Sequence, residues 1–368
     1  MHRRILLVTD EMELGGTQRQ LVELARSLTR ASYAVSVAYF RNPSPLVVEL
    51  ANAGATVTCI AKRRRMDPVF FFKLCRFLRK GDFDIVHAFS LTGELWTCLA
   101  NLVAGRARFI SSIRAVYQWY TPFQWTLKRW VTTHSTALIA NSHTGAEYAA
   151  MKMGIRRNRI EVVYNALGRG VEQRRREVTG RPRLLLFVGR LIATKNLPCL
   201  LRALALVPVR VNSWHLDIVG DGPERSALER LSRQLDLDDR VTFHGAQPAV
   251  AGYFGRADIV VCTSHSEGLS NSIMEGMAAG CTVVATNVGG NAELIEHGVN
   301  GLLFPDDDHE TLAELLVELL ADPHGGRPLG RKAMATMRPF QDVDRLGREM
   351  TRIYDHCLVD ETAWLAGR

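Results

Sequence analysis

Short runs of β-branched and aliphatic residues alternate with amphipathic segments along this chain, and this alternation constrains the fold more than any other feature. Between the first two runs, Leu21, Ala25 and Leu28 recur at helical spacing. Buried strands that alternate with helices predict a parallel sheet covered by helices on both faces. The runs of the first half are ILLV (5–8), AVSVAYF (34–40), TVTCI (56–60), DIVHAF (84–89), RFISSI (108–113) and TALIAN (136–141).

The alternation is interrupted at residues 168–183, where Gly, Pro and Arg replace the apolar periodicity, and then starts again. The second series reads LLLFVG (184–189), HLDIVGDG (215–222), VTFHG (241–245), DIVVCTS (258–264), TVVATNVGG (282–290) and GLLFP (301–305). A chain of 368 residues also exceeds what one hydrophobic core usually holds. We therefore predict an α/β protein with two doubly wound, Rossmann-like domains.

The predicted domain boundaries follow from the same pattern. The first domain covers residues 1–170, a linker covers 171–183, and the second domain covers 184–337. The C-terminal segment of about 338–368 contains a helical pattern beyond the last strand signal, so we expect it to pack back on the first domain.

The composition is that of an ordinary soluble globular protein, with 47% hydrophobic and 23% charged residues. The seven cysteines form no CxxC pair, and several lie inside apolar runs, as buried thiols do in a reducing compartment. The N-terminal stretch MHRRILLVTDEME has too short an apolar run for a signal peptide, and no run approaches the roughly 18 apolar residues of a membrane-spanning helix. We therefore expect a cytoplasmic protein without a disulfide framework.

The net charge of +8 is compatible with nucleic acid, an anionic membrane surface or a phosphorylated substrate as a partner. Nucleic-acid binding would call for cations interleaved with base-stacking aromatic residues on a recognised module. The sequence contains no such module, so we expect no nucleic-acid partner.

The first motif is TDEMELGGTQRQ (9–20), in which Gly15 and Gly16 follow the first strand and open a helix. Glycines at such a place let backbone N–H groups approach a phosphate or a sugar closely. The spacing is not GxGxxG, which disfavours a dinucleotide site of the dehydrogenase type. On this stretch alone, a tight turn that binds nothing explains the pattern equally well.

The second motif is FVGRLIATKN (187–196), in which a strand ends at Gly189 and the following loop supplies Arg190 and Lys195. A guanidinium and a flexible ammonium together suit a diphosphate. A solvated pair of charges is the alternative, but ligands bind outside the carboxyl ends of strands in open α/β sheets, and this loop is at such an end.

The third motif, HSEGLSNSIMEG (265–276), places Glu267 and Glu275 in a stretch that is otherwise small and apolar. We expect a short helix with Ser270 as its N-cap and Gly280 as its stop. Its first amides, from Gly268, Leu269 and Ser270 onward, would face an anion. A carboxylate accepts two hydrogen bonds, so both acids suit the vicinal diols of a sugar or a ribose. Exposed surface acids are the alternative, and the apolar neighbours argue against it.

Together these motifs resemble those of the retaining glycosyltransferases of family 4, which have the GT-B fold and use nucleotide sugars. The resemblance covers essentially the whole chain. The motifs that carry it are the pair Glu267 and Glu275, FVGRLIATKN (187–196), VGDGPERSALE (219–229), VGGNAELIEHGVNGLLF (288–304) and ELGGTQRQLVELA (13–25).

The resemblance implies a role for each residue. Arg190 and Lys195 hold the donor diphosphate and stabilise charge on the leaving phosphate. Glu275 binds the ribose hydroxyls, and Glu267 contacts hydroxyls of the transferred sugar. Gly16 and the amides near Gly268 complete the phosphate cradle. Family members are generally independent of metals, so we expect no metal and no cofactor beside the nucleotide-sugar donor, which we expect to be a UDP-sugar.

Many relatives carry a histidine after the first-domain strand that ends here at Ile113, whereas this chain has Arg114. A guanidinium at this place can bind a sugar oxygen or a phosphate, so we count Arg114 among the substrate-binding residues, with a rim cation as the alternative. His87 also follows a strand, and we interpret it as a core histidine with satisfied hydrogen bonds.

Two segments have the composition of a membrane-surface helix. Residues 62–80 combine apolar side chains with cations on both flanks, and residues 116–130 concentrate three tryptophans among tyrosines, a phenylalanine and two cations. A core-facing helix with a solvated basic side is an equal alternative for 62–80. Our hypothesis is peripheral attachment to the inner face of the cytoplasmic membrane, where a glycan or lipid-linked sugar is the acceptor.

Three other functions are compatible with part of the pattern. A glycoside hydrolase also uses paired carboxylates, but it has no need of Arg190 and Lys195 at a strand end. A nucleotide-sugar epimerase with the same two-domain architecture is the closer alternative. A non-catalytic basic binding protein is the third.

Overall fold

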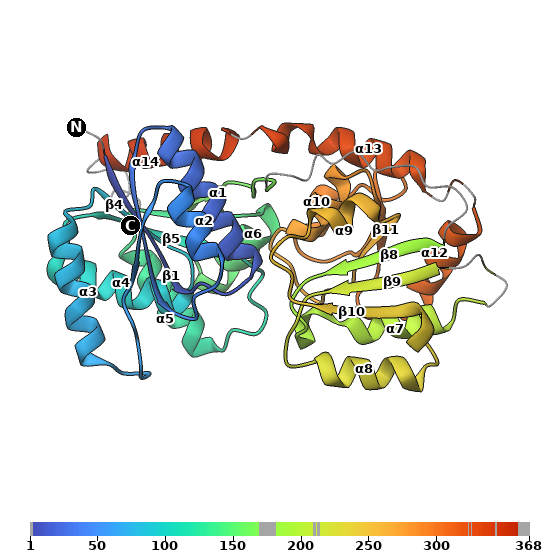
Figure 1. Cartoon of the computed structure of the whole chain (residues 1–368). Helices are drawn as coiled ribbons and strands as arrows, with labels where there is room; N and C mark the ends of the chain where they lie inside the picture. The colour runs from blue at the N-terminus through green and yellow to red at the C-terminus, as the bar shows by residue number, and fades with distance from the viewer. Residues whose placement is uncertain are drawn as a thin grey trace. The chain divides into compact units, whose positions relative to one another are not determined.

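The computed structural model describes residues 3–168, 182–208, 211, 214–322, 324, 326–342 and 344–359. It divides into two compact units (Figure 1). Unit 1 contains the described residues up to Ala166 together with the C-terminal helix, and unit 2 runs from Leu167 to Asp342.

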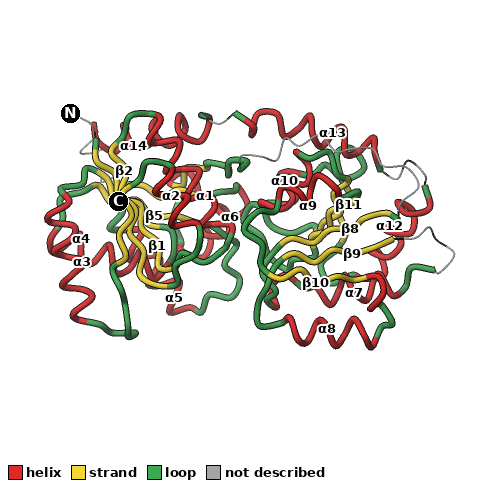
Figure 2. The backbone as a smooth tube through the Cα atoms, in the orientation of Figure 1, coloured by secondary structure: helices red, strands yellow, loops and turns green. Residues whose placement is uncertain are grey.

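Unit 1 is built on a parallel sheet, whose seven strands among the described residues have the order β3-β2-β1-β4-β5-β6-β7. Figure 2 shows these strands in yellow between helices in red. The strands are β1 (Arg4–Glu11), β2 (Ala34–Arg41), β3 (Thr56–Cys59), β4 (Ile85–Ala88), β5 (Arg108–Ile113), β6 (Ala137–Ala140) and β7 (Ile160–Val162).

Helices cover both faces of this sheet. The unit 1 helices are α1 (Gly16–Arg30), α2 (Leu46–Asn52), α3 (Pro68–Gly81), α4 (Leu91–Ala104), α5 (Pro122–Thr133), α6 (His143–Met153), the short η1 (Arg157–Arg159) and α14 (Arg345–Val359). Alternate residues of β1 face opposite sides, so Ile5 and Leu7 pack with α1 and α14, whereas Leu6 and Val8 pack with α3 and α4. A strand buried on both faces explains why β1 reads as an uninterrupted apolar run.

Helix α14 joins unit 1 although it follows unit 2 in the sequence. Leu346, Met350 and Tyr354 lie in the same core cluster as Leu21 and Leu28 of α1. Their spacing of four residues places them on one face of α14, which packs against α1.

Unit 2 repeats the topology of unit 1. Its parallel sheet has the order β10-β9-β8-β11-β12-β13 among the described residues, which is the doubly wound order 3-2-1-4-5-6. The strands are β8 (Arg183–Val188), β9 (Trp214–Val219), β10 (Val241–Gly245), β11 (Ile259–Cys262), β12 (Thr282–Thr286) and β13 (Leu302–Phe304).

The helices of unit 2 cover its sheet in the same way. They are η2 (Ala193–Lys195), α7 (Leu197–Ala205), α8 (Arg225–Gln234), η3 (Asp238–Arg240), α9 (Ala251–Arg256), α10 (Asn271–Ala278), α11 (Asn291–Leu294), α12 (His309–Ala321), α13 (Arg327–Met337) and η4 (Arg338–Gln341). Leu200 of α7 and Leu316 of α12 pack with Leu185 and Leu216 on one face. On the other face Gly276 of α10 lies against Val260 so closely that a Cβ there would overlap the valine.

The fold class predicted from the sequence is confirmed, and each predicted run contains a strand. Strand β7 was not predicted, because its three residues include the exposed Glu161 and form no apolar run. Residues 171–181 of the predicted linker lie outside the described residues, and Arg183 is already the first residue of β8. Of the predicted C-terminal segment, residues 360–368 also lie outside them.

Candidate active site

The carboxyl ends of β8 and β11 meet at the topological switch point of unit 2, where the strand order reverses. The two strands pair in parallel. In the sheet order, β8 is followed by β9 on one side of the pair, and β11 is followed by β12 on the other side. Ligands of doubly wound sheets bind in the crevice outside such a point. Arg190 and Lys195 follow β8, and Glu267 follows β11, so the topology alone brings the second and third sequence motifs together.

Lys195 and Glu267 form an ion pair at this point. Lys195 Nζ lies 2.5 Å from Glu267 Oε1. Ser264 Oγ donates a second hydrogen bond to the same oxygen at 2.7 Å. The two loops are also tied by their backbones, because Thr263 Oγ1 donates to the Lys195 carbonyl at 2.9 Å and His265 N donates to the Thr194 carbonyl at 3.0 Å. The pair is therefore held by the loops and does not depend on the side chains alone.

Both members of the pair keep hydrogen-bonding capacity that the described residues do not fill. The three donors to the Glu267 carboxylate, Lys195, Ser264 and the distant Cys262 thiol, all address Oε1, and no described residue donates to Oε2. Lys195 Nζ carries three protons and makes one hydrogen bond within the described residues. With side chains 25% and 12% exposed, the two groups present an open cation and an open carboxylate oxygen side by side.

The charge on Lys195 is stabilised by its surroundings. Burial alone lowers the pKa of Lys195, but the Glu267 carboxylate, Cys262 and the hydrogen bond with Glu267 outweigh burial, so the pKa is raised above 10.5. Arg190 is exposed, and it is close enough to Lys195 to lower this pKa slightly. Two cations therefore share the strand end, which favours a ligand with more than one negative charge.

Glu275 lies inside α10, one of the helices that start at this edge of the sheet. Gly268, Leu269 and Ser270 are buried in the turn before it. Ser270 occupies the N-cap position as predicted, but its hydroxyl bonds to Ser272 and caps no backbone amide, so the expected side-chain cap is wrong. Ser270 has an extended backbone with ψ of 114°. Its side chain leaves the first backbone amides of α10 without a cap. Gly280, with φ of +76°, ends the helix region as predicted.

Glycines let four loops of this edge touch in two pairs through their main chains. A Cβ at Gly220, which follows β9 with φ of +147°, would overlap the carbonyl oxygen of Gly189. A Cβ at Gly289, which follows β12 with φ of +53°, would overlap the carbonyl oxygen of Glu267. The loops that carry Arg190 and Glu267 are thus each backed by a neighbouring loop at a distance that only glycine permits.

Sequence reasoning missed the residues that support Glu267. Ser264 is fully buried and bonds the carboxylate, and Thr286 at the end of β12 donates to the Ser264 carbonyl at 2.7 Å. A signal was present, because polar residues that directly follow a buried strand, as Thr263 and Ser264 follow β11, belong to the functional edge of a parallel sheet.

The other predicted site residues, Gly15, Gly16 and Arg114, belong to unit 1. Gly15 is the N-cap of α1 and Gly16 its first residue, so the two glycines follow β1 and open a helix as predicted. Arg114 follows β5 and is partly buried, and its Nη2 donates to Asn165 Oδ1 at 2.8 Å. Its guanidinium lies 5.9 Å from the Phe89 ring centroid. Burial lowers the pKa of Arg114 to about 10, which leaves it charged at neutral pH.

Unit 1 holds a second lysine–glutamate pair, which the sequence analysis did not single out. Lys128 of α5 and Glu94 of α4 are 1% and 0% exposed. Lys128 Nζ contacts both Glu94 oxygens at 2.6 Å, the Ser112 carbonyl at 2.7 Å and Ser111 Oγ at 3.0 Å. Ser111 Oγ and Ser112 N also donate to Glu94 Oε1, so this pair is saturated. Burial lowers the pKa of Lys128, and Glu94 opposes that shift.

This pair corrects the membrane interpretation of residues 116–130. Lys128, counted there as a cation for lipid headgroups, is buried on Glu94, and Trp125 is 7% exposed in the core. Trp119 and Phe123 are exposed. His87, by contrast, is a core histidine as interpreted: it is fully buried, with Nδ1 2.7 Å from Tyr354 OH and Nε2 2.7 Å from Ser112 Oγ.

The described residues contain no group of three or more His, Cys, Asp or Glu side chains arranged to hold a metal ion. No helix among them is long and apolar enough to cross a membrane.

Comparison with known proteins identifies the family. The model for glycosyltransferase family 4 matches residues 14–167, and that for glycosyl transferases group 1 matches residues 182–322. The chain belongs to the family 4, group 1 glycosyltransferases. As a family member it shares 28% identity over 210 residues with the N-acetyl-alpha-D-glucosaminyl L-malate synthase of Bacillus anthracis, a match that covers 55% of each chain. It shares 31% over 245 residues with a D-inositol 3-phosphate glycosyltransferase of Thermomonospora curvata, covering 59% of this chain and 57% of the relative.

Each match thus spans a little over half the length of these curated relatives. Solved structures match over the whole fold. HepE of Anabaena, crystallised with UDP-glucose, has a TM-score of 0.86 at 20% identity, with 96% of this chain and 100% of that chain covered. A mutant of S. aureus TarM, crystallised with UDP, has a TM-score of 0.78 at 11% identity, with 96% of this chain and 100% of that chain covered. At these identities the likeness concerns the fold, and it confirms the predicted GT-B architecture of this family member.

Proposed function

We propose that this protein is a retaining glycosyltransferase that moves a sugar from a nucleotide-sugar donor to a glycan or lipid-linked acceptor in polysaccharide or glycoconjugate biosynthesis. One observation carries the proposal: the Lys195–Glu267 pair at the switch point of unit 2 leaves two ammonium protons and one carboxylate oxygen open. A diphosphate accepts from the ammonium, and a sugar hydroxyl donates to the carboxylate. A nucleotide sugar has these two groups next to each other.

The proposed chemistry follows from the charges that develop. The bond between the anomeric carbon and the diphosphate oxygen breaks, so negative charge grows on the diphosphate and positive charge on the sugar ring. Lys195 and Arg190 are cations already in place, and they stabilise the negative charge on the diphosphate. The Glu267 carboxylate lies on the side of the positively charged sugar ring. The acceptor hydroxyl attacks from the face that the diphosphate leaves, and its proton passes to the departing phosphate. The anomeric configuration is retained, and no protein base is assigned.

We propose a UDP-sugar as the donor. HepE, with the same fold, was crystallised with UDP and with UDP-glucose, and TarM with UDP, which supports this choice by analogy of fold. In this assignment Glu275 binds the ribose hydroxyls. The amides near Gly268 bind the phosphate, and Gly16 and Arg114 of unit 1 are proposed as further donor contacts, Gly16 to the phosphate and Arg114 to the sugar or the phosphate.

The exposed side of α3 supports a proposal for where the reaction takes place. Its Phe70, Leu74 and Leu78 face the core, so part of its apolar content has a structural role. Val69 and Phe72 are 64% and 68% exposed on its other side, among the cations of the segment 62–80. We propose that this side attaches the enzyme to an anionic membrane surface. Flotation with phosphatidylglycerol liposomes at low salt tests this proposal, and recovery of the protein in the soluble fraction contradicts it.

A panel of nucleotide sugars, screened by thermal shift and then by product analysis, tests the function. A matched donor stabilises the folded protein by mass action. We expect UDP and one UDP-sugar to raise Tm, and transfer to an acceptor to give a product with the anomeric configuration of the donor by NMR. Epimerised donor in the absence of acceptor would point to an epimerase, and an inverted product would exclude the retaining mechanism. Activity that survives EDTA is expected, because two cations replace the metal ion.

A further inference from the structure

A second group of charges lies at the carboxyl ends of β1, β2 and β3 in unit 1. Asp10 is near the end of β1 and Arg41 ends β2. Lys62 follows β3, and its amide still donates to the Phe40 carbonyl at 3.1 Å, so the chain continues beside β2 to that point. The switch point of this sheet lies between β1 and β4, and Asp10 N donates to Ser90 Oγ, the N-cap of α4, at 3.3 Å. This is the ligand-binding edge of unit 1.

The acids of this region are already engaged. Arg41 Nη2 lies 2.6 Å from Glu11 Oε1 and 3.6 Å from Asp10 Oδ2. Asp67 caps α3 through Phe70 N at 3.0 Å and also accepts from Arg63 N at 3.0 Å. These three carboxylates therefore serve Arg41 or the start of α3.

Lys62 has no carboxylate partner among the described residues. Its Nζ donates to the Arg64 carbonyl at 2.6 Å and lies 5.6 Å from the Trp96 ring centroid, contacts that hold the ammonium in place without neutralising it. Burial, and after it the charge of Arg41, lower the pKa of Lys62, although Asp67 and Asp10 oppose the shift. Lys62 is thus a partly buried cation that is held in position and has no carboxylate to neutralise it within the described residues. Such a cation is preorganised to bind an anion.

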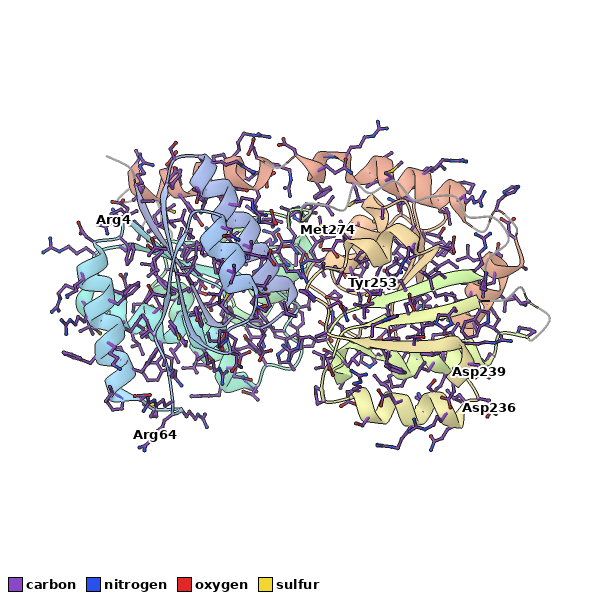
Figure 3. The ribbon with its side chains drawn as sticks, in the orientation of Figure 1. Arg4, Arg64, Asp236, Asp239, Tyr253 and Met274 are labelled. Atoms are coloured by element: carbon purple, nitrogen blue, oxygen red, sulfur yellow. The ribbon has the colours of Figure 1, made fainter. Side chains whose placement is uncertain are left out.

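The surrounding loop adds further positive charge. Arg63, Arg64 and Arg65 are exposed beside Lys62. Figure 3 labels Arg64, whose side chain extends from the loop before α3. Two hydrogen bonds hold the backbone of this loop, from Lys62 Nζ to the Arg64 carbonyl and from Arg63 N to Asp67 Oδ2.

We propose that Lys62, flanked by Arg41 and Arg64, binds a negatively charged group of the acceptor, a phosphate or a sugar carboxylate. This inference rests on the proposed function, in which the donor takes the strand ends of unit 2 and, apart from the contacts proposed for Gly16 and Arg114, leaves those of unit 1 to the acceptor. It narrows the acceptor to acidic saccharides or sugar phosphates. A lipid-linked sugar carries such a phosphate, and an acidic glycan carries the carboxylate.

Binding of three soluble probes in the presence of saturating UDP tests the proposal. The probes are glucose 1-phosphate, methyl glucuronide and the neutral methyl glucoside, titrated calorimetrically into wild type, Lys62→Met and Lys73→Met. The last variant is the matched control, because Lys73 is an exposed cation of α3 and its loss lowers the net charge equally. We expect a charged probe to bind wild type and Lys73→Met alike and Lys62→Met about tenfold or more weakly. Binding of both charged probes that is unaffected by Lys62→Met, or no stronger than that of the glucoside, overturns the proposal.

Two controls distinguish this inference from the proposed donor site and from the proposed membrane attachment. UDP should raise the Tm of all three proteins equally, and if UDP has no effect on any of them the proposed donor site fails independently of Lys62. Liposomes of phosphatidylglycerol distinguish a lipid headgroup from an acceptor anion. Loss of vesicle binding in Lys62→Met with unchanged binding of the soluble anions assigns Lys62 to the membrane surface and overturns the acceptor role. Loss of soluble-anion binding with vesicle binding kept supports it.

Discussion

The two lysine–glutamate pairs of this protein differ in how completely their hydrogen bonds are filled. Lys128 and Glu94 of unit 1 are almost fully buried, and the ammonium contacts four oxygens within 3.0 Å. Lys195 and Glu267 of unit 2 are partly exposed, the donors to the carboxylate among the described residues all address one oxygen, and the other is open to a ligand. The same two residue types thus form a closed structural pair in one sheet and an open pair in the other.

The difference shows how to tell a structural ion pair from a binding site. Removing one member of a buried, saturated pair leaves an uncompensated charge, so the effect falls on stability. Removing one member of an open pair costs little stability, because water still reaches the remaining group, but it removes a contact that the reaction uses. Four variants and one pH series test this contrast.

The largest effect is expected for Lys128→Met, which leaves Glu94 buried without its cation. We expect the free energy of unfolding to fall by about 3–5 kcal/mol, measured by urea denaturation. The double variant Glu94→Leu/Lys128→Met should recover part of the loss, although Ser112 N still lacks its acceptor. Arg129→Met, at the exposed neighbouring position, is the control. Equal stability of Lys128→Met and Arg129→Met would mean that the pair is not structural.

The second effect concerns turnover. Lys195→Ala removes a cation from the leaving diphosphate, and we expect kcat to fall about 100-fold, with the free energy of unfolding changed by less than about 1 kcal/mol. Steady-state kinetics and urea denaturation measure the two quantities. Lys332→Ala removes an exposed lysine of the same unit and should leave both unchanged. A large loss of stability in Lys195→Ala would place this pair in the structural class as well.

The third effect concerns binding. Glu275→Ala should weaken UDP binding about tenfold, because the ribose hydroxyls lose a charged acceptor, and should change kcat less than Lys195→Ala does. Calorimetric titration with UDP measures it, with Glu314→Ala, an exposed acid of α12, as the control. An unchanged dissociation constant would remove Glu275 from the donor site.

A smaller effect is expected at Ser264, which orients Glu267 but touches no substrate in the proposed site. Ser264→Ala removes one of the hydrogen bonds to Oε1, and we expect kcat to fall about threefold to tenfold. The donor KM should change less than kcat, because the diphosphate contacts remain. Ser264→Thr keeps the hydroxyl and should restore part of the rate; failure of the threonine to restore any activity would indicate a packing defect instead.

The smallest expected effect is that of pH on Lys195. Its pKa is raised in the folded protein, so the pair's contribution is complete below the ordinary value of 10.5 and is lost only as the pH rises through the raised value. The ratio of wild-type to Lys195→Ala kcat/KM should therefore be constant between about pH 7 and pH 9. A ratio that falls toward one within this range would show that the ammonium loses its proton there.

The sequence predicted the two doubly wound domains and singled out Lys195 and Glu267, the members of the open pair, whereas it did not single out the closed pair. Strand ends are readable because buried strands are apolar runs, so the polar residues that follow them stand out. Lys128 and Glu94 lie inside helices, where charged residues usually face water. A helical signal existed, since Trp125, Lys128 and Val131 recur at a spacing of three and all are buried. Glu94, however, meets Lys128 only through the tertiary packing of α4 on α5, which no local pattern encodes.

The main-chain contacts at Gly220 and Gly289 have a consequence for redesign of this enzyme. The loops that carry Arg190 and Glu267 rest on other backbones rather than on replaceable side chains. Any side chain at either glycine would overlap the neighbouring backbone and displace a whole loop. Side chains around the loops can change without disturbing these backbone contacts. Efforts to alter donor preference should therefore leave these glycines in place and randomise the residues beside them.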